Sequence, residues 1–109
     1  NRLQLLVAIL QKRLSLPLGA FDVFVNVSGG LRVNEPAADL AVAMAIISSF
    51  KNKALDPKVA VFGEVGLLGE VRGVGSEGRR SKEAKRLGFS TVISPERTRN
   101  LKQAIGVLG

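Results

Sequence analysis

The stretch 37–50 constrains the fold of this chain more than any other part of its sequence. It is almost wholly apolar, with five alanines and with Asp39, Ser48 and Ser49 as its polar interruptions. Asn34-Glu35-Pro36 precedes it, and a capping residue followed by proline is typical of a helix start. The stretch is shorter than the roughly 18 uninterrupted apolar residues of a membrane span. It therefore predicts a central, buried helix over 36–50.

The segments on either side of this helix alternate between helical and extended patterns. Leucines at helical spacing predict a helix over 2–14, and Val23, Val25 and Val27 alternate as in a half-buried strand over 22–27. Ser28-Gly29-Gly30 indicates a turn, after which 31–33 resumes extended structure. Downstream, the pattern predicts strands over 58–62, 69–74 and 89–93 and helices over 76–87 and 94–105. Gly63, Gly66 and Gly69 indicate a tight reversal between the first two of these strands. Ser76 is the expected cap of the helix over 76–87, and Gly88 is its expected end.

This order of elements predicts an α/β (α+β) single domain in which helices pack on a mixed sheet. The length of 109 residues suits one domain. The chain lacks an initiator methionine and opens inside an apolar helical pattern. We therefore expect 1–109 to be one domain of a longer protein.

The composition excludes several kinds of chemistry. The chain has no Cys and no His, so disulfides, a thiol nucleophile, a His general base and the usual zinc sites are ruled out. It also has no Gly-rich Lys-Ser/Thr loop for phosphates. We expect this segment to use no cofactor.

Positive charge gathers in the last third of the chain. The formal net charge is +7, and from Arg72 onward nine basic residues face three acidic ones, which is +6 of that total. Such an imbalance favours an anionic partner, nucleic acid first and an acidic protein surface second. A merely solvated surface is the plainer alternative.

Several motifs resemble one family in the same order along the chain. Residues 62–71, FGEVGLLGEV, resemble the TGEVTLRGRV segment of Lon protease proteolytic domains, and the match continues through Gly75, Gly88 and Pro95. Residues 22–30 and 35–41 resemble the RadA/Sms version of this domain. The resemblance covers about 1–98 and implies a Lon-protease-like fold.

The resemblance also bears on catalysis, because Lon-type proteolysis uses a Ser–Lys dyad. The family's serine follows a proline at the start of the central helix, where this chain has Ala37. The family's lysine falls at Gly78, and the adjacent arginines stay protonated and cannot act as the base. We therefore expect no peptidase activity; a divergent Ser-type peptidase is the remote alternative.

RadA/Sms proteins, as the resemblance implies, join a zinc finger and a RecA-like ATPase to this domain. They form hexameric rings that act on DNA during recombination and repair and promote branch migration. ATP, Mg and Zn are accordingly expected in other parts of such a protein. The expected partners are a second copy of the chain and duplex or branched DNA, without a membrane. The expected compartment is the bacterial cytoplasm, or the chloroplast stroma or mitochondrial matrix of a plant.

The helix over 76–87 gives the DNA hypothesis a geometry. At 100° per residue, Arg79, Lys82, Glu83 and Arg86 share one face, Lys85 lies at its shoulder, and Ala84 and Leu87 face the core. Such a face can contact phosphates without reading bases. The five phenylalanines fall mostly in core-like patterns, which argues against base stacking. The candidate DNA-binding residues are Arg79, Arg80, Lys82, Lys85, Arg86, Arg97 and Arg99.

Arg80 falls in the sector that faces the core, which requires a special explanation. Its side chain can snorkel outward, reach into the space of the former dyad, or cross a subunit boundary to Asp39 or Glu35. Glu35, Asp39 and Arg80 are therefore the candidate interface residues. The plainer role of Asp39 is to complement the helix dipole. A purely structural oligomerisation module, whose basic face meets an acidic partner, is the alternative function.

Overall fold

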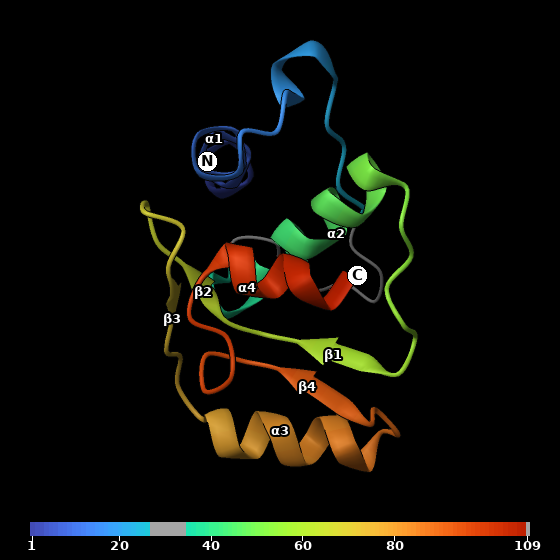
Figure 1. The fold of residues 1–109 in the computed structure, drawn as a ribbon. Helices are drawn as coiled ribbons and strands as arrows, with labels where there is room; N and C mark the ends of the chain where they lie inside the picture. Colours follow the sequence, from blue (N-terminus) through green and yellow to red (C-terminus); the bar gives the residue numbers. More distant parts are fainter. Residues whose placement is uncertain (27–34, 109) are drawn as a thin grey trace.

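A computed structural model describes residues 1–26 and 35–108. Its elements stack from α1 through α2 and α4 to β1 and β4, and then to α3 on the opposite side from α1 (Figure 1). In chain order they are α1 (Arg2–Leu14), η1 (Leu18–Ala20), η3 (Pro36–Ala38), α2 (Asp39–Lys51), β1 (Val59–Val61), β2 (Glu64–Val65), β3 (Val71–Arg72), α3 (Glu77–Arg86), β4 (Thr91–Ile93), α4 (Leu101–Ile105) and η4 (Gly106–Leu108), where η denotes a 3-10 helix.

The predicted central helix is confirmed. It begins as the 3-10 turn η3, with Pro36 at its first position, and continues as α2. Leu40, Ala43, Met44 and Ile47 recur at helical spacing and are fully buried. They pack with Leu6 and Leu10 of α1 and with Leu101 and Ala104 of α4. α2 is thus the centre of the core, as its alanine-rich sequence predicts.

The strands form two small sheets among the described residues, where one mixed sheet was predicted. β1 pairs with β4 in parallel, and β2 pairs with β3 in antiparallel orientation. The glycine-rich reversal joins β2 to β3, closed by the amide of Gly66 donating to Glu70 and that of Gly69 donating to Gly66. The α/β class is confirmed, while the pairing depends on contacts distant in sequence.

The predicted strand over 22–27 is wrong over its described part. Residues 22–26 form no strand and pair with none of the described strands. The side chains nevertheless alternate in burial as predicted, because Val23 and Val25 pack against the core while Phe24 is exposed. Alternation reports which side is buried; a strand also needs a neighbour to accept its hydrogen bonds. Val27, the predicted turn at 28–30 and the extended segment 31–33 lie outside the described residues.

Two predicted helix ends also differ. The carbonyl of Ser94 accepts the amides of Arg97 and Thr98 in a turn, and α4 begins only after Asn100, whose side chain accepts the amide of Gln103. Ser76 has φ 59° and makes no side-chain cap. Instead, the Glu77 carboxylate accepts the amide of Val74. No helix of the described part has the length and apolarity that crossing a membrane requires.

Candidate nucleic-acid interface

Helix α3 presents a cationic face on the outside of the molecule. It lies against β4, its half-buried residues include Ser81 and Ala84, and none of its residues is fully buried. Arg79, Lys82, Glu83 and Arg86 are exposed on the opposite side, which matches the predicted face. The chain leaves the helix at Gly88, whose φ of 101° suits glycine.

The predicted burial of Leu87 is wrong, because this side chain is 61% exposed. A helix of ten residues is about 15 Å long, whereas a strand of three residues extends about 10 Å. The helix is thus longer than the strand that it lies against, and Leu87, the C-cap residue after Arg86, stays exposed at its end.

One cation of this face is already paired. The Arg86 Nε donates to Glu83 Oε2 at 2.9 Å, and the Arg86 Nη2 donates to the other carboxylate oxygen. The hydrogen bond from Arg86 lowers the pKa of Glu83 and raises that of Arg86. Among the described residues, no carboxylate pairs with Arg79, Lys82 or Lys85. On this helix, these three cations are therefore open to an external anion.

The Arg86→Gln variant is expected to raise the pKa of Glu83 toward its ordinary value. The charged hydrogen bond that favours the carboxylate is then gone. An NMR titration of the Glu83 side chain measures the shift. Lys82→Gln removes an equal charge one residue away and should move this pKa less. An unchanged Glu83 pKa in Arg86→Gln would mean that the pair does not persist in solution.

Arg97 and Arg99 occupy different surroundings. Arg97 borders a polar hollow between α3 and the turn after β4, and Lys85 borders the same hollow. The Arg99 carbonyl accepts the amide of Val71, and its side chain is exposed beside β3. Arg97 and Lys85 of α3 therefore line the same hollow. Among the described residues, no hydrogen bond or ion pair connects the Arg99 side chain to α3.

Arg80 bends back over the start of its own helix. Its Nε donates to the carbonyl of Gly75 at 2.8 Å, and its Nη2 lies 4.0 Å from the Glu35 carboxylate. The side chain remains 39% exposed, as snorkelling predicts. Its contact with Glu35 is within one chain, where the sequence suggested a contact between subunits.

Asp39 is not available to a second chain, contrary to the interface hypothesis. Its side chain is buried and accepts from Arg2 Nε and Nη2, both at 2.6 Å, and from the amide of Val65 at 3.1 Å. Arg2 also donates to Glu64 at 3.0 Å. These contacts raise the pKa of Arg2, chiefly through the hydrogen bond to Asp39. The sequence pattern missed this cluster; its one signal is a cation at the start of α1, where the helix dipole disfavours it.

Ala37 and Gly78, which the resemblance aligns with the Lon dyad, lie at the starts of different helices. Ala37 is buried in η3, and its carbonyl accepts the amide of Gly63 at 2.9 Å. Gly78 is exposed in the first turn of α3, and a β-carbon there would meet nothing within 4 Å. Neither residue carries a nucleophile or a base.

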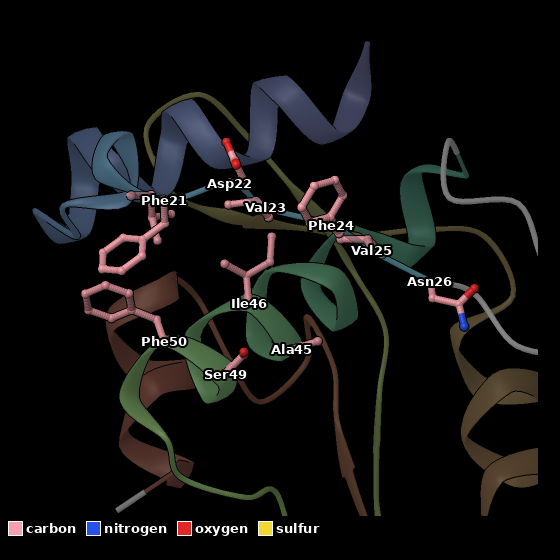
Figure 2. Close-up of a pocket in the computed structure, with 11 residues that line it drawn as sticks. Phe21, Asp22, Val23, Phe24, Val25, Asn26, Ala45, Ile46, Ser49 and Phe50 are labelled. Atoms are coloured by element: carbon pink, nitrogen blue, oxygen red, sulfur yellow. The ribbon is translucent and has the colours of Figure 1, made fainter.

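The sequence pattern predicts that most of the phenylalanines lie in the core, but three of them do not. Phe62 is buried, but Phe21, Phe24 and Phe50 are exposed. They border an apolar hollow of about 650 Å³ between the segment 21–26 and α2. Figure 2 shows Val23 directed toward Ile46 while Phe24 points away from α2. The rings of Phe21 and Phe50 meet edge to face at 5.8 Å. The core-like sequence pattern therefore does not exclude base stacking by these three exposed rings.

Comparison with known proteins agrees with the resemblance. The model of the Lon protease (S16) C-terminal proteolytic domain matches residues 16–105, which include positions 37 and 78. The chain is 53% identical over 97 residues to the DNA repair protein RadA of Campylobacter jejuni and 52% over 96 residues to that of Aquifex aeolicus. These matches cover 89% and 88% of this chain but 22% of each relative, so the chain spans about a fifth of their length. It belongs to the Lon protease C-terminal domain family, in the form that RadA proteins carry.

Proposed function

We propose that this chain is a non-proteolytic Lon-type domain that serves DNA repair by binding the DNA backbone. This proposal rests on the cationic face of α3, where Arg79 and Lys82 are exposed and have no carboxylate partner among the described residues. Cations spread along an exposed helix attract phosphates at any sequence. The similarity of the chain to DNA repair proteins supports this biological setting.

The absence of proteolysis is the second part of this proposal. Ala37 offers no oxygen for attack on a carbonyl, and Gly78 offers no amine to accept a proton. Incubation with an unfolded protein substrate should yield no cleavage. Sustained cleavage that one serine substitution abolishes would overturn this part and restore the peptidase alternative.

DNA binding is tested best through its dependence on salt. The double variant Arg79→Ala/Lys82→Ala should flatten the plot of log affinity against log salt by about 2, one for each lost phosphate contact. Fluorescence anisotropy with a labelled duplex at several salt concentrations measures the slope. The loss should be equal for duplexes of unrelated sequence, since no base is read.

Lys12→Ala is the matched control for this experiment. Lys12 is an exposed helical lysine on α1, and Figure 1 places α1 and α3 on opposite sides of the molecule. The substitution removes the same kind of side chain but should leave the slope unchanged. Equal slopes for the wild-type chain and the α3 variant, or no duplex binding at low salt, would contradict the proposal.

We further propose that the chain assembles with copies of itself, up to the hexameric ring implied by its family. Light scattering would then give six times the chain mass of 11.6 kDa. A monomer at all concentrations would contradict assembly by this domain alone. Since Asp39 is buried, the contacts between copies must involve other residues.

We propose that the chain works in the bacterial cytoplasm or in the interior of a plant organelle. We also propose that it needs no cofactor of its own.

A further inference from the structure

We infer that the polar hollow between α3 and the turn after β4 binds one phosphate group. This inference deepens the proposed function, because it places one DNA phosphate at a defined point beside the α3 face. The hollow has a volume of about 170 Å³, and its polar lining is Ser81, Lys85, Ser90, Ser94, Glu96 and Arg97.

The first support is size. A water molecule takes up about 30 Å³ in the liquid. A hollow of about 170 Å³ therefore accommodates a tetrahedral oxyanion with part of its hydration shell. A single base would also fit by volume, so the chemistry of the lining, in which Val92 is the one apolar residue, decides in favour of phosphate.

The second support is the kind of groups that converge there. Lys85 from α3 and Arg97 from the turn supply two cations, which no ion pair within the described residues neutralises. Ser81, Ser90 and Ser94 supply hydroxyl groups, which can donate to an anion. Glu96 opposes binding but is outnumbered by the two cations. Hydroxyl groups with Lys and Arg are characteristic partners of phosphate oxygens.

The third support is position. Ser81 and Lys85 are four residues apart on α3 and so lie on the same side of the helix. Lys85 is at the shoulder between this side and the face that carries Lys82. A backbone that lies along the exposed face can thus place one phosphate in the hollow. The site restrains the register of the DNA, which a flat cationic face cannot do.

The first experiment uses inorganic phosphate as the probe and the backbone amide signals of the 109-residue chain as the readout. At constant ionic strength, phosphate should shift the signals of Ser81, Ser90, Ser94, Glu96 and Arg97 in a saturable manner. Lys85→Gln should weaken this binding about tenfold, and Ser81→Ala should weaken it about threefold. Glu96→Gln should strengthen it, because it removes the opposing charge. Lys12→Gln should leave it unchanged.

The second experiment relates the hollow to DNA. Lys85→Gln should lower duplex affinity about threefold more than Lys82→Gln, which removes an equal charge outside the hollow. Inorganic phosphate should compete with the duplex more strongly than chloride at equal ionic strength. If the duplex binds, yet Lys85→Gln equals Lys82→Gln and phosphate shifts none of these amides, the hollow is not a phosphate site and the proposed function stands. If phosphate saturates the hollow but no duplex binds, the site holds for free phosphate groups and the proposed function fails.

Discussion

Replacing Arg2 by methionine is expected to lower the free energy of unfolding by about 3–5 kcal/mol. Methionine keeps most of the aliphatic length but removes the charge that pairs with Asp39. The Asp39 carboxylate has a side-chain exposure of 1%, and after the substitution the amide of Val65 is its one remaining donor among the described residues. At about 4–8 °C for each kcal/mol in a domain of this size, thermal unfolding should occur more than about 10 °C lower. Circular dichroism during heating and urea denaturation measure both quantities.

Two comparisons isolate the ion pair from other effects of this substitution. Lys12→Met removes an exposed cation from the same helix and should change stability by less than about 0.5 kcal/mol. In an Asp39→Asn background, Arg2→Met should cost much less, because no charge is left unpaired. An equal cost of Arg2→Met in both backgrounds would show that the destabilisation has another origin.

Gly63→Ala and Gly78→Ala are expected to change stability in opposite directions. Gly63 is buried with φ 150°, and a β-carbon there would lie 3.1 Å from Val71 Cγ1 and 3.4 Å from Pro95 Cγ. Backbone strain and this crowding should cost about 2 kcal/mol or more. Gly78 lies in α3, where alanine is the better helix former and meets no neighbour within 4 Å. Gly78→Ala should therefore add about 0.5–1 kcal/mol.

Urea denaturation of the two alanine variants, side by side with the wild-type chain, measures both changes. Gly63 also holds the start of α2 to β2, because its amide donates to Ala37 and its carbonyl accepts from Leu40. The Gly63→Ala variant should therefore also lose the amide hydrogen-exchange protection of Leu40. A Gly63→Ala protein as stable as wild type would contradict the conformation described for this segment.

The features that depend on neighbours in sequence were predicted well. The helical spacing of apolar residues predicts both α1 and α2, since a helix brings residues three and four apart onto one face. The same geometry predicts which side of α3 carries Arg79, Lys82 and Arg86. The residues at positions 37 and 78 are read from the sequence directly, and their alignment with the dyad rests on the resemblance of the motifs around Gly63 and Gly75.

The features that depend on distant parts of the chain required the three-dimensional structure. Nothing near Asp39 in sequence indicates Arg2, which is 37 positions away. A carboxylate that only complements a helix dipole therefore cannot be distinguished in sequence from one that forms an ion pair. Likewise, each residue of β1 pairs with a residue of β4 that is 32 positions away, and the alternating segment 22–26 pairs with no described strand. The hollow joins Lys85 to Arg97 because a helix and a turn happen to meet there. Local periodicity establishes which side of an element is buried, while its partners follow from packing across the whole chain.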